Sequence, residues 1–220
     1  MIKRKKTIAF QKIERLYSRQ RPRIEARLAD FTRLWQTGTE EDIFAELAFC
    51  LFTPQSKALL CWQTVRTLIE KDLLLKSTHA KIAAELNRVR FKNNKARYLI
   101  EARTLFASNG SVALRPRLES LPDPADARDW LVRNVKGLGL KEAAHFLRNI
   151  GRSQQLAILD RHILRNLCAL GVIDQIPTSL TPKKYFDIEK KMQAFSENIK
   201  IPPAHLDLLL WCKETGEVFK

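Results

Sequence analysis

The chain has 220 residues, of which 45% are hydrophobic and 29% are charged. This length and balance exclude a disordered chain and a small scaffold that depends on disulfides or metals, because enough apolar surface is available to build a core. The 39 lysine and arginine residues outnumber the 24 aspartate and glutamate residues, and the formal net charge is +15. Such an excess predicts a polyanionic partner, with nucleic acid as the first candidate.

An anionic membrane is the other polyanion to consider. The sequence has no run of 18 apolar residues, and its first six residues lack the apolar core of a signal peptide. The cysteines at positions 50, 61, 168 and 212 are widely spaced and form no CxxC pair, which excludes a zinc ribbon or finger. We therefore expect an intracellular protein without a membrane partner, in which reduced cysteines pack as small apolar residues.

The first helical pattern covers residues 8–35 and contains Pro22 near its middle. Because proline breaks or kinks a helix interior, this pattern predicts two helices that meet near Pro22. The basic residues 3–6 ahead of it are expected to form a solvated terminus, and direct contact with DNA is the alternative.

The second pattern is a strongly apolar helix over residues 43–52, opened by Thr39 with the spacing of a capping box. A helix that is apolar on all sides belongs in the core. It breaks at the polar turn of residues 53–57, which we expect to be held rigidly with outward side chains. An ordinary helix N-cap turn around Ser56 is the alternative. The polar side chains of this turn are Gln55, Ser56 and Lys57.

Basic residues gather where the next two helical segments meet, after residues 78–89. Together with one aromatic residue they have the composition of an edge that faces nucleic acid. The aromatic residue, Phe91, packs in the core or faces the nucleic acid, and the core is the favoured interpretation. The basic residues are Arg90, Lys92, Lys95, Arg97 and Arg103.

Turn-forming residues at 108–111 and 116–124 predict a loop region, and we expect a boundary between two lobes near residues 108–124. Asp123 and Pro124 then have the residue types of an N-cap and a first helical position. The helix that they begin is expected to end near Val135.

Two glycines, Gly137 and Gly139, separate that helix from another that begins at Leu140. Their spacing predicts a tight hairpin between two helices, and its bare backbone brings N–H groups within reach of an anion at the second helix's N-terminus. A phosphate is the natural occupant.

Lys141 lies in the first turn of this second helix, where the helix dipole disfavours a cation by roughly 0.3–1 kcal/mol. The same position favours the neutral, nucleophilic form of the amine. A solvated helix lysine is the alternative. Asp160, 19 residues later, directly precedes a helical pattern and is expected to be its N-cap.

Gly171 is expected to close that helix, and helical patterns follow at residues 185–199 and 204–213, the last one ended by Gly216. No repeat and no segment with strand periodicity is found. The sequence therefore predicts an all-α fold in two helical lobes.

The glycine hairpin, with Lys141 two residues past Gly139 and Asp160 beyond it, resembles the helix-hairpin-helix DNA glycosylases, specifically their bifunctional glycosylase/AP-lyase branch. The ending at residues 206–220 resembles the shorter 8-oxoguanine DNA glycosylases of archaea and some thermophilic bacteria. This resemblance runs from Gln55 to Lys220. It implies a single two-lobed unit over residues 1–220, with the hairpin and catalytic segment at 124–170, in the cytoplasm or nucleoid of a prokaryote.

The resemblance also implies roles for individual residues. Lys141 matches the nucleophile of the family, and Asp160 matches the carboxylate that assists it. The hairpin is expected to hold the DNA backbone, and the turn around Gln55 to fill the space that a flipped nucleotide leaves. Base recognition is implied for Trp211, Lys220 and Phe91. The DNA-binding set is Lys136, Gly137, Leu138, Gly139, Gln55, Ser56 and Lys57.

The implied function is base-excision repair by a monomer that flips 8-oxoguanine out of duplex DNA. A lysine Schiff base would remove the base and β-elimination would cleave the strand, with no metal and no redox cofactor. A glycosylase/lyase for another damaged or mismatched base is one alternative. A non-catalytic helix-hairpin-helix DNA-binding module is the other, although it leaves Lys141 at an unfavourable helix start without a role.

Overall fold

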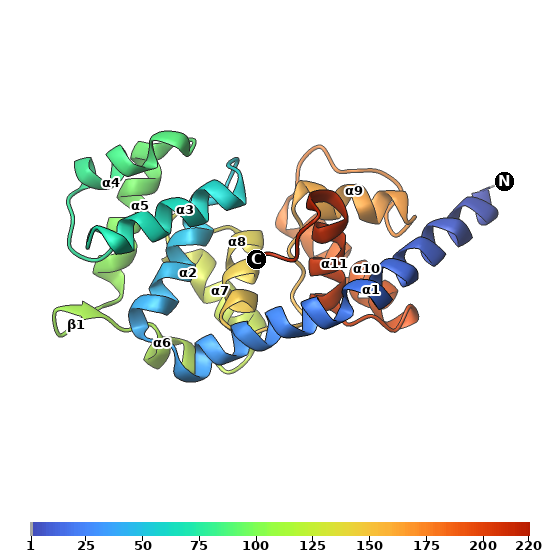
Figure 1. Cartoon of the computed structure of the whole chain (residues 1–220), viewed down its shortest axis with the longest axis horizontal. Helices are drawn as coiled ribbons and strands as arrows, with labels where there is room; N and C mark the ends of the chain where they lie inside the picture. Colours follow the sequence, from blue (N-terminus) through green and yellow to red (C-terminus); the bar gives the residue numbers. More distant parts are fainter. Residues whose placement is uncertain (1) are drawn as a thin grey trace. The chain divides into compact units, whose positions relative to one another are not determined.

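The structure is a computed structural model that describes residues 2–220, with side chains from Phe10 onward (Figure 1). In chain order the helices are α1 (Ile2–Thr37), α2 (Glu40–Phe52), α3 (Ala58–Glu70), α4 (His79–Glu85), the 3-10 helix η1 (Leu86–Arg88), α5 (Lys92–Leu105), α6 (Arg115–Glu119), α7 (Pro124–Asn134), α8 (Leu140–Asn149), α9 (Arg161–Ala169), α10 (Pro182–Asn198) and α11 (Pro203–Thr215). The all-α prediction is confirmed. Within residues 2–220, none of the helices has the length and apolar character needed to cross a membrane.

The chain forms two compact units. The first combines the residues up to Thr32 with Ser153–Lys220, and the second is Arg33–Arg152. The turn-rich segment 108–124, where the sequence predicts a lobe boundary, lies inside the second unit. It stays there because Leu114 and Leu118 are fully buried and tie the segment to the core of that unit.

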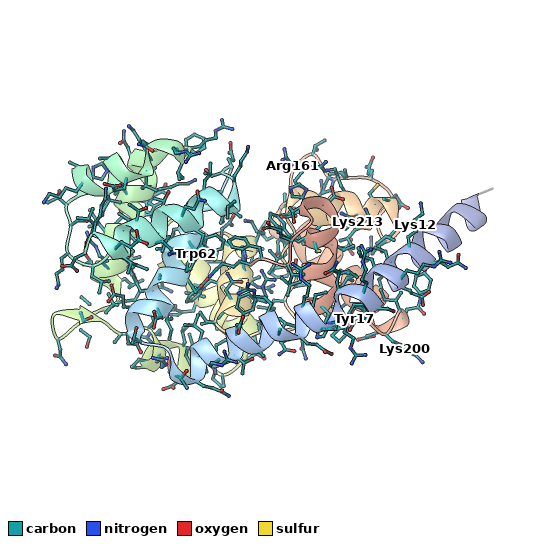
Figure 2. All side chains as sticks on the ribbon, viewed as in Figure 1. Lys12, Tyr17, Trp62, Arg161, Lys200 and Lys213 are labelled. Carbon is teal, nitrogen blue, oxygen red and sulfur yellow. The ribbon has the colours of Figure 1, made fainter. Side chains whose placement is uncertain are left out.

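The second unit is built around α2, whose residues from Ile43 to Phe52 are all buried. This helix packs against α3, α5 and α8. Its capping box is present, since the Thr39 N–H donates to Asp42 Oδ2 at 2.8 Å and the Asp42 N–H donates to Thr39 Oγ1 at 3.1 Å. From α3, Trp62, labelled in Figure 2, packs edge-on against Phe49 of α2 with ring centroids 5.8 Å apart. The predicted core position of the apolar helix is therefore confirmed.

A short antiparallel hairpin joins α5 to α6, with strands β1 (Ala107–Ser108) and β2 (Ser111–Val112). Asn109 and Gly110 between them have φ values of 47° and 80°. Two successive left-handed residues match the twist of a two-residue hairpin turn, for which Asn-Gly is a preferred pair. Strands of two residues are too short to show strand periodicity, so the all-α prediction did not include this hairpin.

In the first unit, α9 and α10 pack against α11. This unit also contains α1 as far as Thr32. The hydroxyl of Tyr17 on α1, a residue labelled in Figure 2, lies 3.0 Å from Nδ1 of His205 on α11. Burial lowers the pKa of His205. Gly171 and Gly216 follow α9 and α11 with φ values of 71° and 84°, as expected of helix-ending glycines.

Helix α1 corrects the prediction of two helices that meet near Pro22, because Pro22 lies inside one continuous helix of 36 residues. Proline in a helix interior costs about 3 kcal/mol or more. Buried side chains on both sides of Pro22, Ile13 and Ile24, offset that cost by packing on the core. The side chains of residues 3–6, predicted to form a solvated terminus, lie outside the described part of the chain.

None of the four cysteines, all of which lie in the described part of the chain, forms a disulfide, and three of them are buried. Burial raises the pKa of Cys61 to about 11 and also raises that of Cys212. Both thiols therefore stay protonated at neutral pH, as predicted for cysteines that pack as small apolar residues.

Candidate functional site

The glycine turn between α7 and α8 has the shape that its sequence predicts. Gly137 adopts φ +96°, and a Cβ built on it would meet Cδ2 of Tyr98 at 2.4 Å. Gly139 is the N-cap of α8, with φ −97° and ψ −176°. The turn therefore requires glycine at position 137 for two reasons, whereas position 139 has an ordinary extended backbone.

Lys141 follows directly in the first turn of α8, and its side chain is 21% exposed. Its ammonium lies 3.0 Å from Glu142 Oε1, while Glu142 Oε2 accepts the Gly139 N–H at 3.3 Å. Glu142 thus connects the glycine turn to the amine of Lys141. A base that accepts the proton is needed before Lys141 can act as a nucleophile.

The polar turn after α2 presents Gln55 to solvent. The turn is closed by a hydrogen bond from the Ser56 N–H to the Thr53 carbonyl, at 3.0 Å. Gln55 has φ 54°, although the left-handed region favours glycine or asparagine. Lys57 is the N-cap of α3 and makes no side-chain cap bond, so the alternative of an ordinary N-cap turn around Ser56 was wrong.

Lys95 lies near this turn, and its burial is the feature that the sequence did not predict. Its side chain is buried, and its Nζ donates to the Phe52 carbonyl at 2.7 Å, to the Pro54 carbonyl at 2.7 Å and to Ser56 Oγ at 3.1 Å. Burial lowers its pKa to about 8, with a smaller contribution of the same sign from Lys141. Lys95 therefore does not belong to an exposed basic edge.

Arg103 is a second exception to that edge, because its guanidinium donates to the Ser77 carbonyl at 2.7 Å and burial lowers its pKa. Arg90, Lys92 and Arg97 are exposed, as the prediction requires. Phe91 is 52% exposed, so the favoured interpretation of a core residue was wrong. Its backbone is left-handed, with φ 59°, which turns the side chain away from the core at the N-cap of α5.

In the first unit, Asp160 is the N-cap of α9, as predicted. Its Oδ1 accepts the N–H groups of His162 and Ile163, each at 2.8 Å. Arg161, labelled in Figure 2, begins the helix. The cap uses one carboxylate oxygen, so the other remains available for a second task.

Trp211 on α11 belongs to the same unit as Asp160. Its ring packs edge-on against His162, with centroids 5.3 Å apart. His162 Nδ1 lies 3.8 Å from Glu214 Oε2, and hydrogen bonding from Asn166 lowers the pKa of Glu214. His162 and Glu214 had no signal in the sequence beyond their helical spacing. Lys220 is half-buried, and Val218, two residues before it, is buried.

The structure therefore groups the predicted residues in two sets. The second unit holds the glycine turn, Lys141, Phe91 and the Gln55 turn. The Arg90 N–H, next to Phe91 in the chain, donates a hydrogen bond to Ser56 Oγ of the Gln55 turn at 3.1 Å. The first unit holds Asp160, Trp211 and Lys220. The pairing of Lys141 with Asp160 stays a prediction.

An all-helical chain with a glycine turn between two helices, and a lysine in the first turn of the second, defines a protein of the helix-hairpin-helix class. The family model described as 8-oxoguanine DNA glycosylase matches residues 24–201. The chain belongs to this family.

Two relatives are similar to the chain over nearly its whole length. The 8-oxoguanine DNA glycosylase/AP lyase of Fusobacterium nucleatum is 47% identical over 216 residues, which cover 98% of this chain and 100% of that protein. The protein of the same name from Korarchaeum cryptofilum is 38% identical over 205 residues, with coverages of 92% and 93%.

Solved structures are similar as well. The 8-oxoguanine DNA glycosylase of Thermotoga maritima has a TM-score of 0.85 at 33% identity, covering 98% of this chain and 100% of that one. The 8-oxoguanine glycosylase/lyase of Methanocaldococcus jannaschii, in complex with a 15mer DNA containing 8-oxoguanine, has a TM-score of 0.86 at 32% identity, covering 97% and 100%.

Proposed function

We propose that this protein is a bifunctional 8-oxoguanine DNA glycosylase/AP lyase that excises the oxidised base from duplex DNA. The observation that supports it most is the position of Lys141, which is half-buried in the first turn of α8 and directly follows the glycine turn in the chain. It occurs in a chain that is 47% identical to a protein named for this activity. Its site of action would be the nucleoid of a prokaryotic cell.

In the proposed reaction, neutral Lys141 Nζ attacks C1′ of the flipped nucleotide. The bond from C1′ to the base breaks, and the base leaves with the electron pair and is protonated. The nitrogen of Lys141, now bonded to C1′, loses a proton. The C1′–O4′ bond then breaks and O4′ takes up a proton, so that the opened sugar is joined to the lysine as a Schiff base. Ionised Asp160 accepts the proton from the lysine and stabilises the positive charge that develops on the sugar. Asp160 can combine this role with its cap, since the cap occupies only Oδ1.

The lyase step follows from the same covalent link. Loss of a proton from C2′ moves electrons toward the imine, and the C3′–O bond breaks with departure of the 3′ phosphate. Hydrolysis of the imine then releases Lys141. No step calls on a metal or a redox cofactor.

The remaining predicted residues would bind the DNA. The backbone N–H groups of the turn from Lys136 to Gly139 would hold a phosphate at the N-terminus of α8. Gln55 would enter the stack in place of the flipped nucleotide and meet the partner base, with Ser56 and Lys57 beside it. Trp211 and Lys220 would contact the 8-oxoguanine ring, and Phe91 would lie against the bases near the lesion.

The experiment is base release under single-turnover conditions from three duplexes that differ only in the target base: 8-oxoguanine, an oxidised pyrimidine and a mismatched thymine. The proposal predicts release of 8-oxoguanine alone, followed by strand cleavage. Faster release of another base would move the protein to a different substrate. Tight binding of all three duplexes without base release would make it a non-catalytic binding module.

A further inference from the structure

The buried ammonium of Lys95 is not needed by the proposed chemistry, yet it is elaborately bound. It donates three hydrogen bonds, to the carbonyls of Phe52 and Pro54 at 2.7 Å each and to Ser56 Oγ at 3.1 Å. These acceptors lie at the C-terminal end of α2 and in the turn that follows it, where a cation also complements the negative end of the helix dipole. Lys95 thus ties the Gln55 turn to α5.

Lys95 also connects the Gln55 turn to a second turn, formed by Arg90 and Phe91 ahead of α5. Its backbone N–H donates to the Phe91 carbonyl at 3.0 Å, and Ser56 Oγ, which Lys95 binds, accepts the Arg90 N–H at 3.1 Å. Each of the two turns presents one exposed side chain from a left-handed residue, Gln55 with φ 54° and Phe91 with φ 59°. Such a backbone persists in residues other than glycine only where the surroundings hold it.

Fold stability alone explains Lys95 poorly. Burial lowers its pKa to about 8, so at neutral pH the charged form is held in a place that disfavours it. Among the groups around it, Glu142 favours the ammonium, whereas Lys141 and Arg90 oppose it. The Cys61 thiol, with a pKa of about 11, carries no charge at neutral pH. An apolar side chain of similar length would fill the same volume without this cost. It would remove a donor from the Phe52 and Pro54 carbonyls and leave the Phe52 carbonyl with the Cys61 thiol.

We propose that Lys95 is a positioning residue for base excision, which fixes the Gln55 turn in the shape that inserts Gln55 into the DNA stack and sets Phe91 beside it. The inference rests on the proposed function, because only an enzyme that flips a nucleotide needs a residue to fill the vacated space. Lys95 itself touches neither the DNA nor the reacting atoms in this account, and it acts through the turn.

The test compares Lys95→Met, Lys95→Arg, Gln55→Ala and the Lys95→Met/Gln55→Ala double variant. Lys81→Met, which removes an exposed lysine from α4, is the matched control for loss of one charge. Single-turnover excision is measured on 8-oxoguanine duplexes with cytosine opposite the lesion or with an abasic analogue there. On the second duplex no partner base has to be met. Thermal unfolding of each variant reports on folding separately.

We expect Lys95→Met to slow excision opposite cytosine by roughly 10- to 100-fold, because a shift of about 1 Å in a positioning group can slow a reaction by about that factor. The effect should be small opposite the abasic analogue, and the double variant should be no slower than the slower single variant, because both changes disable one device. Lys95→Arg should recover part of the rate, since it restores a cation to the carbonyls. Lys81→Met should match the wild type.

Equal slowing on both duplexes, or effects that add in the double variant, would overturn the inference and make Lys95 a general stabiliser of the fold. If the wild type excises 8-oxoguanine and Lys95→Met does so at the same rate, the inference fails while the proposed function stands. If the wild type releases no base from either duplex, the proposed function itself fails.

Discussion

The two glycines of the hairpin should respond very differently to alanine. At Gly137 the backbone has φ +96°, and a new Cβ would lie 2.4 Å from Tyr98 Cδ2. The left-handed conformation costs an alanine about 1–2 kcal/mol. Displacing a packed ring adds about 1–3 kcal/mol. Their sum, about 2–5 kcal/mol, is divided between lost stability and lost DNA affinity, according to whether the turn keeps its shape or relaxes.

Gly139 supplies the matched control. Its φ of −97° suits any residue, and a Cβ there would meet only the flexible carboxylate of Glu142, at 3.1 Å. Gly139→Ala should therefore cost about 1 kcal/mol or less, through a weaker N-cap.

The assay is fluorescence anisotropy of each variant with undamaged duplex and with 8-oxoguanine duplex, alongside the free energy of unfolding. Gly137→Ala should lose affinity for both duplexes in equal proportion, since the turn holds phosphate and carries no base information. Equal behaviour of the two alanine variants would refute the argument from backbone geometry. A loss confined to lesion DNA would reassign the turn to the base pocket.

Three further predictions concern other residues. Asp160→Asn should cut single-turnover excision by roughly 10²–10⁴-fold, whereas the unfolding temperature should change little because asparagine is an equally good N-cap; full activity would leave Asp160 with the cap alone. Deleting Lys220 should slow 8-oxoguanine excision and spare cleavage at a preformed abasic site, where no base is read, and equal effects on the two substrates would remove it from base recognition. Lys95, with its pKa lowered from 10.5 to about 8, binds its proton less tightly in the folded state, so the cost of burying its charge fades as the pH rises above 8. Cys61, with its pKa raised from 9.0 to about 11, lowers the free energy of unfolding as the pH rises above 9. The effect of Lys95 is therefore best measured between pH 8 and pH 9. There the free energy of unfolding of the wild type should rise relative to Lys95→Met, and parallel curves in urea would show that the ammonium is not buried.

The parts of the fold that were predicted correctly are those in which local chemistry and packing agree. Thr39 and Asp42 supply a cap for a helix whose following residues are apolar except for Glu46, so both the start of α2 and its place in the core could be predicted. The glycine turn was predictable because few residues tolerate a left-handed backbone.

Pro22 shows where local rules fail. The cost of a proline inside a helix is local, but the burial of Ile13 and Ile24 that offsets it depends on tertiary packing. The β1–β2 hairpin is a different case, because the Asn109-Gly110 pair was visible and was interpreted only as a loop. A preferred turn pair is enough to close a hairpin of two-residue strands without any alternating pattern.

The burial of Lys95 was missed because composition does not show the direction of a side chain. Counted in helical steps, Lys95, Leu99 and Ala102 follow the spacing i, i+4, i+7, which places them on one face, and all three are buried. This periodicity could have separated Lys95 from its exposed basic neighbours. The pairing of Lys141 with Asp160 came from the family resemblance, since neither residue alone specifies its partner.

The most direct test of the account is borohydride reduction of the wild type on 8-oxoguanine duplex, with the trapped peptide identified by mass spectrometry, alongside Lys141→Gln. The Schiff-base mechanism predicts a covalent complex in which the modified residue is Lys141. It predicts no such complex with Lys141→Gln, although that variant should still bind the duplex. A complex that persists in the variant, or base release by the wild type without any trapped species, would contradict the Schiff-base mechanism.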